Sequence, residues 1–314
     1  MSKIKKRILV TGGTGFLGKN LVPKLAQKFE SVTVIAQERE RNIFSGLDNV
    51  RILIGDIKNE GFLQRALKKK DICFHLASFK RNFKYHTENP GKVFWENEEI
   101  SHSFFKSVFE SSLKNLIVMG SAAVYAPKDS FISESDPLNL ESQDAYALSK
   151  ISAENGARVL SYSRPDMSIV LVRSDNFYGE KDNFGPEAQV LPSLIRKSIE
   201  DEEIVVWGSG RQKRTFIFVE DVCDALIRLG KLKKGFYVFN ISTGEKTDFK
   251  KIIKIIKKIV KGNKKVIFDT SKPEGASCRL VSAEKIKKEL KWKPKYNLEK
   301  GLEKAIRYYL ENKN

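Results

Sequence analysis

The most constraining feature of this sequence is a run of closely spaced glycines directly after a short apolar stretch. The apolar residues end at Thr11, and Gly12, Gly15 and Gly18 follow at intervals of three. Glycine permits positive φ, lets the backbone approach a pyrophosphate, and lets the next helix pack tightly on the strand. A strand–loop–helix unit of this kind holds phosphates at the helix N-terminus. The loop therefore predicts a dinucleotide site, and we expect contacts to the dinucleotide from Gly12, Thr14, Gly15, Phe16, Leu17 and Gly18.

Short apolar runs alternate with helix-like segments through the first half of the chain. Strands are expected over 8–11, 32–36, 50–54, 72–76, 116–119 and 168–172, and helices near 16–28, 59–70, 93–112 and 145–162. This alternation is typical of a parallel sheet covered by helices on both faces. We predict an α/β fold, a Rossmann-type doubly wound sheet with a smaller C-terminal substrate-binding lobe. The expected domains are 1–175 with about 215–244, and a lobe from about 176–214 and 245–314, with amphipathic helices near 248–260 and 299–311.

Composition removes several classes of protein. The net charge of +18 comes from 57 basic and 39 acidic residues, but lysines dispersed over amphipathic segments account for most of it, so no nucleic-acid partner is expected. No apolar stretch approaches the roughly 18 residues of a membrane span. Three widely separated cysteines give no metal-site spacing and fit a reducing compartment. We expect a cytoplasmic protein that binds neither a membrane nor a metal.

The end of the second expected strand bears on the choice between NAD and NADP. An acid there binds the ribose hydroxyls, whereas arginines hold a 2′-phosphate. Gln37, Glu38 and Arg39 give a mixed signal, and Thr14 adds no positive charge, so NAD is favoured over NADP. Asp56 and Ile57, at the end of the third strand, are further expected cofactor contacts; an adenine amino group or a helix N-cap would each explain the acid.

Tyr146 and Lys150 stand four residues apart on an expected helix, so they share one face. Hydride transfer to or from an alcohol carbon needs a base for the hydroxyl proton, and a nearby ammonium lowers the tyrosine pKa from about 10 toward neutral. The spacing alone is weak evidence, because Tyr296/Lys300 and Tyr309/Lys313 repeat it. Ser121, at the end of an expected buried strand, singles out Tyr146. We predict that Ser121, Tyr146 and Lys150 are catalytic.

These motifs resemble the extended short-chain dehydrogenase/reductases that act on nucleotide sugars. The resemblance covers almost the whole chain and includes the glycine loop, Asp56, His75 to Ser78, Asn97 and the Ser-Tyr-Lys group. It implies cofactor contacts from Leu76, Ala77, Ser78, Tyr146 and Lys150. Within the family, the carboxyl half is most similar to the GDP-L-fucose synthase group, in 176–184, 190–197, 205–214 and 269–275.

The same resemblance implies a GDP-sugar pocket for a mannose-type hexose or a relative with a longer carbon chain. The positions that match its substrate contacts are Ser121, Asn176, Val190, Lys197, Trp207, Arg214, Lys272 and Arg279. It also suggests a homodimer or homotetramer joined by the helices near 97–112 and 146–162.

Two departures from this group concern proton transfer. Its cysteine and histidine, which move protons at the carbons beside a 4-keto group, are replaced by Ala123 and Gln189. Neither an alanine nor an amide exchanges a proton at neutral pH. We therefore expect the epimerising chemistry to be absent, with His75 on a strand and with His86 and His102 near helices remote from the sugar.

The preferred interpretation is an NAD-dependent dehydrogenase or reductase at C4 of a GDP-mannose-type sugar, as a step toward a surface polysaccharide. Two other enzyme activities stay open: a 4-epimerase with tightly bound NAD, and a GDP-4-keto-6-deoxy-sugar reductase. A non-catalytic NAD(P)-sensing protein is the alternative of another class, although the intact Ser-Tyr-Lys group favours catalysis.

Overall fold

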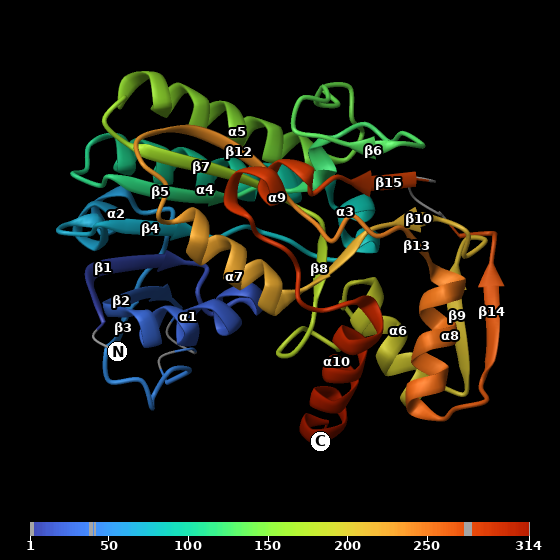
Figure 1. Ribbon diagram of the computed structural model, residues 1–314. Helices are drawn as coiled ribbons and strands as arrows, with labels where there is room; N and C mark the ends of the chain where they lie inside the picture. The colour runs from blue at the N-terminus through green and yellow to red at the C-terminus, as the bar shows by residue number, and fades with distance from the viewer. Residues whose placement is uncertain (1–2, 38–39, 41, 273–277, 314) are drawn as a thin grey trace.

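The computed structural model describes residues 3–37, 40, 42–272 and 278–313. At its centre lies a seven-stranded sheet in the order β12-β7-β5-β4-β1-β2-β3, with every neighbouring pair parallel (Figure 1). In chain order its strands are β1 (Ile4–Thr11), β2 (Phe29–Ala36), β3 (Val50–Ile54), β4 (Ile72–His75), β5 (Asn115–Met119), β7 (Ser168–Ser174) and β12 (Gly235–Ile241).

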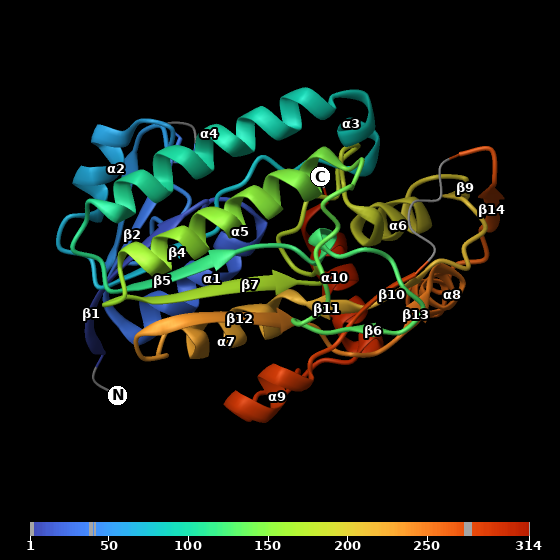
Figure 2. The same cartoon turned by 90° about the horizontal axis from the view of Figure 1, so that it is seen from above.

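Helices cover both faces of this sheet (Figure 2). One face packs against α1 (Phe16–Lys28), α7 (Val219–Leu229) and α9 (Glu284–Leu290), and the other against α2 (Glu60–Leu67), α4 (Pro90–Phe109) and α5 (Ala145–Ser163). Because the sheet is covered twice, its central strands are apolar on both sides, and all seven residues of β7 are buried. The predicted Rossmann-type fold is confirmed.

The carboxyl half also forms a second body with its own apolar core, which includes Leu194, Ile252 and Ile306. Its helices are α6 (Val190–Ile199), α8 (Phe249–Val260) and α10 (Leu298–Asn312). The strands outside the central sheet form small sheets: β9 (Glu203–Trp207) with β14 (Lys265–Asp269), β8 (Asn176–Tyr178) with β11 (Phe216–Phe218), and β13 (Thr247–Asp248), β10 (Lys213–Arg214), β15 (Cys278–Val281) and β6 (Phe131–Ile132) together. The exact division into two domains stays an interpretation.

The strand order places a crevice between β1 and β4, where successive connections leave toward opposite edges of the sheet. Ligands of open α/β sheets bind outside the carboxyl ends of the strands at such a point. β1 ends at Thr11 and β4 at His75, and the Thr11 hydroxyl lies 2.8 Å from His75 Nδ1. Short segments near this edge are α3 (Phe83–Glu88) and the 3-10 helix η2 (Ala122–Val124).

Throughout the described ranges, no helix combines the length and the apolar composition that crossing a bilayer requires.

Candidate active site

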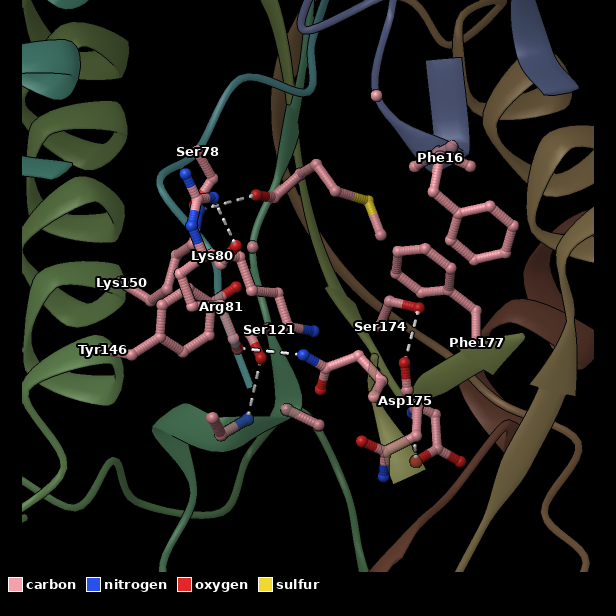
Figure 3. A pocket seen from close by; sticks show the side chains of 18 of the residues that line it. Phe16, Ser78, Lys80, Arg81, Ser121, Tyr146, Lys150, Ser174, Asp175 and Phe177 are labelled. Atoms are coloured by element: carbon pink, nitrogen blue, oxygen red, sulfur yellow. Dashed lines mark hydrogen bonds between the residues drawn. The ribbon is translucent and has the colours of Figure 1, made fainter. Parts of the chain in front are cut away.

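A cleft of about 610 Å³ opens at the carboxyl edge of the central sheet. It brings together the start of α1, the loops after β4 and β5, the first turns of α5, and the segment after β7 (Figure 3). Among the predicted site residues, those that line it are Gly12, Gly15, Phe16, Leu17, Leu76, Ser78, Ser121, Tyr146, Lys150, Asn176 and Arg279. Segments distant in the sequence therefore meet in one place.

The glycine loop has the geometry that close backbone approach requires. Gly12 has φ +65°, and a Cβ added there would lie 2.6 Å from the backbone nitrogen of Ala77. A Cβ on Gly18 would lie 2.2 Å from the carbonyl oxygen of Gly13, so this glycine serves helix–strand packing. The N-cap of α1 is Gly15, which offers no side chain to the first N–H groups of the helix. A phosphate at this end would satisfy them.

The three predicted catalytic residues converge in the cleft. Tyr146 and Lys150 project from the same side of α5, and the structure leaves only 6% and 7% of them exposed. Ser121 follows β5, and the hydroxyls of Ser121 and Ser78 lie close enough to the Tyr146 phenol to lower its pKa. Asp144 caps α5 by accepting from the Tyr146 N–H at 3.0 Å. A phenol, an ammonium and two hydroxyls thus face the same space.

The expected near-neutral pKa of Tyr146 is wrong for the chain by itself. Burial raises the pKa of the phenol to about 12, outweighing the hydrogen bonds from Ser78 and Ser121 that lower it. Burial and, to a smaller extent, the nearby Lys80 charge together lower the pKa of Lys150 to about 8. The phenolate is therefore favoured only when positive charge near the ring compensates for lost hydration.

Sequence reasoning missed Lys80, which lies in the loop after β4. Its ammonium stands 5.7 Å from the centre of the Tyr146 ring, on a par with the 5.6 Å of Lys150. Burial lowers the pKa of Lys80, and the charge of Asp182 opposes this shift. Phe177, also missed, stacks on Phe16 at 5.5 Å. The signal for Lys80 was its position just past a strand end at the ligand edge.

The expectation that His86 is remote from the sugar site is also wrong. His86 lines the cleft, and its ring centre lies 5.2 Å from that of Tyr146. Its Nε2 accepts the Arg81 N–H at 3.1 Å, while Gln189 donates to the Arg81 carbonyl at 2.9 Å. Accepting this bond leaves the proton on Nδ1, and burial lowers the pKa of His86, so the ring is neutral and its basic nitrogen is occupied. Short helix α3 brings it here, which no periodicity in the sequence indicated.

An acid that the sequence reasoning did not select lies beside the glycine loop. The Thr14 hydroxyl donates to the Glu40 carboxylate at 2.6 Å. Glu38 and Arg39, the residues weighed for cofactor choice, lie outside the described residues. Asp56 is exposed at the end of β3 and accepts the Lys58 N–H at 2.9 Å, whereas the N-cap of α2 is Asn59. The helix-cap explanation of Asp56 is therefore wrong, and its role in binding adenine stays a prediction.

The predicted substrate residues divide into two groups. Asn176 and Arg279 line the cleft, and Arg279 Nε is buried with no hydrogen-bond partner among the described residues. Lys197 instead donates to the Val205 carbonyl at 2.7 Å. The predicted residues that do not line the cleft are Thr14, Gly18, Asp56, Ile57, Ala77, Val190, Lys197, Trp207, Arg214 and Lys272. Their assignment as ligand contacts stays a prediction.

Known proteins resemble this chain over nearly its whole length. The chain is 27% identical over 328 residues to GDP-L-fucose synthase 1 of Arabidopsis thaliana, covering 99% of this chain and 95% of that protein. It is 26% identical over 317 residues to dTDP-4-dehydro-6-deoxy-D-allose reductase of Streptomyces bikiniensis, covering 97% and 96%. UDP-glucose 4-epimerase of Thermotoga maritima superposes with a TM-score of 0.87 at 24% identity, covering 98% and 100%, which supports the fold.

The sequence also matches one protein family over residues 8–242, a range that holds the glycine loop and the Ser-Tyr-Lys group. Relatives at this level of similarity are enzymes that modify nucleotide sugars. The chain therefore belongs to the NAD dependent epimerase/dehydratase family.

Proposed function

We propose that this enzyme is an NAD-dependent oxidoreductase that moves a hydride at C4 of a GDP-mannose-type hexose or heptose, as a step toward a surface polysaccharide. The observation that carries this proposal is the convergence of Ser121, Tyr146 and Lys150 in a cleft where no free basic side chain stands at positions 123 and 189. Ala123 has no titratable group, and Gln189 is held by the Arg81 carbonyl. Neither position therefore supplies a group that could exchange a proton with the sugar, whereas the Ser-Tyr-Lys group suits an alcohol–ketone exchange.

The proposed roles follow from the geometry of these side chains. In the oxidising direction, the Tyr146 phenolate takes the proton of the sugar hydroxyl, and Ser121 hydrogen-bonds the same oxygen. Burial raises the phenol pKa, and the role we assign to Lys150 is to supply the positive charge that favours the phenolate. Bound NAD supplies the hydride acceptor at C4, or the donor when it is reduced. The glycine loop and the start of α1 would hold its pyrophosphate.

The cations of the cleft support a diphosphate-bearing substrate. Arg279 is largely buried, and its Nε has no partner among the described residues, so an anion there would remove a desolvation cost. Relatives whose names specify GDP sugars and dTDP sugars both match, so the base is the least constrained part of the proposal. The same relatives support a reductive direction, which these side chains catalyse equally well.

The proposal is tested by supplying GDP-mannose with NAD, and GDP-4-keto-6-deoxy-mannose with NADH. Absorbance at the NADH band follows hydride transfer, and mass spectrometry of the sugar identifies the product. We expect the enzyme to turn over at least one of the two GDP sugars and not to turn over UDP-glucose, which serves as the control. Turnover confined to UDP or dTDP sugars would refute the GDP assignment, and none with any sugar nucleotide would refute the oxidoreductase.

Cofactor preference provides a separate prediction. The Glu40 carboxylate, which accepts from Thr14 in the glycine loop, should repel a 2′-phosphate, so we expect NAD to bind at least about tenfold more tightly than NADP. Titration calorimetry with the two oxidised cofactors measures this ratio. Glu40→Gln should narrow it by weakening the repulsion. Tighter binding of NADP to the wild-type chain would contradict the prediction.

We further propose that the enzyme forms at least a dimer through α4 and α5. Phe109, Val159 and Tyr162 are all more than half exposed on these helices, and the Ser152 hydroxyl bonds Glu98 between them. Exposed apolar side chains on neighbouring helices favour an interface. Sedimentation velocity should give at least twice the 35.8 kDa of one chain, and Val159→Glu with Tyr162→Lys should shift the protein to monomer. A monomeric wild type would contradict this proposal.

A further inference from the structure

Residues 179–189 join β8 to α6 and are here called the strap. Asp182, Asn183, Glu187 and Gln189, all within the strap, line the cleft, and the proposed function assigns this side of it to the sugar. The strap begins with two unusual backbone conformations, Gly179 with φ +153° and Lys181 with φ +65°. A left-handed lysine is uncommon and persists when the surrounding contacts fix the backbone.

The contacts that fix the strap come from the elements predicted to hold the cofactor. Asn20, buried on α1, donates from one side-chain amide to the Phe16 carbonyl at 3.0 Å and to the Glu180 carbonyl at 2.9 Å. Lys181 Nζ donates to the Lys19 carbonyl at 3.2 Å. The first turns of the cofactor helix are thus bonded directly to the start of the strap.

The far end of the strap is tied to the loop after β4. Gln189 donates to the Arg81 carbonyl, and Arg81 Nε lies 3.8 Å from the Glu187 carboxylate. That loop also contains Ser78, a predicted cofactor contact, and Lys80, and both line the cleft. Both ends of a sugar-facing segment are therefore held by cofactor-facing segments.

We infer that Asn20 is a positioning residue that couples cofactor binding to the sugar-nucleotide site through the strap. A ligand that fixes the glycine loop and the first turn of α1 also fixes the Phe16 carbonyl, and with it the orientation of the Asn20 amide. That amide holds Glu180, two residues before Asp182. By linkage, cofactor should tighten sugar-nucleotide binding and the sugar nucleotide should tighten cofactor binding by the same factor.

The chain contains a matched control for Asn20. Asn49 also donates its side-chain amide to backbone carbonyls, those of Ala26 and Phe29, both at 2.9 Å, at the opposite end of α1. Asn49→Ala removes a side-chain amide that donates to a backbone carbonyl of α1, as Asn20→Ala does, but leaves the contacts of the strap in place. Lys181→Asn is a second test on the exposed side: asparagine tolerates left-handed φ but is too short to reach Lys19.

Hydrogen–deuterium exchange of the full chain, with and without NAD, tests this coupling without any sugar nucleotide. We expect NAD to slow exchange in peptides covering both 12–18 and 182–189. In Asn20→Ala the slowing at 12–18 should remain and that at 182–189 should fall about 2- to 10-fold, the range of one lost hydrogen bond. Lys181→Asn should act in the same direction, and Asn49→Ala should behave as wild type.

This inference rests on the proposed function only for the identity of the second ligand, for which GDP-mannose is the probe. Its Kd should tighten with NAD present, and Asn20→Ala should bring the ratio of the two Kd values toward one. The inference would be overturned if NAD did not protect the strap of the wild type. It would also be overturned if NAD protected the strap of Asn20→Ala as strongly as that of the wild type. NAD that fails to protect 12–18, or GDP-mannose that never binds, would instead count against the proposed function.

Discussion

Replacing Tyr146 by phenylalanine should lower turnover by about 10²- to 10⁴-fold, because the variant loses the group that exchanges a proton with the sugar hydroxyl. Phenylalanine keeps the aromatic ring, which contacts His86 and which the ammonium groups of Lys80 and Lys150 face. Dinucleotide affinity should therefore change little. Initial rates with a sugar nucleotide that the wild type turns over, together with titration of NAD, separate the two quantities.

Tyr309→Phe is the matched control for this variant. Tyr309 also precedes a lysine by four residues, but it lies on α10, donates to Glu200 and is not one of the residues that line the cleft. We expect its turnover to stay near the wild-type value. Equal losses in both variants would show that the wrong tyrosine is assigned, or that the substitutions act through folding.

Replacing Arg173 by methionine should lower the free energy of unfolding by about 3–5 kcal/mol, the usual effect of removing one partner of a buried ion pair. Arg173 on β7 donates to Glu154 at 2.8 Å, and the two side chains are only 4% and 2% exposed. It also donates to the Tyr125 hydroxyl at 2.8 Å, which in turn bonds Asn240. The substitution leaves the Glu154 carboxylate buried between α5 and the sheet without its positively charged partner. Chemical denaturation of the wild type and the variant measures the difference.

The pH dependence of this loss identifies its cause. Burial raises the pKa of Glu154, and without the guanidinium that lowers it the pKa should rise further. A carboxyl whose pKa is higher when folded binds more protons in the native state, so its burial costs least below the unfolded pKa and most above the folded one. The deficit of Arg173→Met should therefore shrink at pH 5 relative to pH 8. Adding Glu154→Leu should recover much of the stability at pH 8. A deficit unchanged by pH and by the second substitution would mean that packing, not charge, is lost.

Much of the fold followed from local patterns. The glycine loop after an apolar run required a β–α unit, and the strands buried on both faces required a parallel sheet with two helical layers. Ser121 and the pair on α5 could also be predicted, since strand ends and helix periodicity together place them at the carboxyl edge. Each of these features depends on residues near one another in sequence or on a simple rule of topology.

The missed features depend on contacts between loops. His86 reaches the cleft because a six-residue helix, α3, turns it toward Tyr146, and Glu40 reaches Thr14 across the turn after β2. The pKa of Tyr146 was misjudged for a related reason: the Lys150 charge is evident from spacing, whereas the desolvation that raises the phenol pKa depends on the folded surroundings. Lys80 was missed because the chain has many lysines, and only the position of Lys80 in the cleft distinguishes it from the others.

The most direct test of a chemistry confined to C4 is isotope incorporation from deuterated water into GDP-4-keto-6-deoxy-mannose during reduction by NADH. Exchange of the carbon-bound protons beside a ketone needs a titratable group placed against them. Ala123 offers none, Gln189 is engaged with Arg81, and the His86 nitrogen that accepts protons is occupied by a backbone N–H. Mass spectrometry and NMR of the product should therefore show hydride delivered to C4 with no deuterium at C3 or C5. Rapid, enzyme-dependent deuterium uptake at either carbon would contradict the account and would mean that the enzyme is an epimerase as well as a reductase.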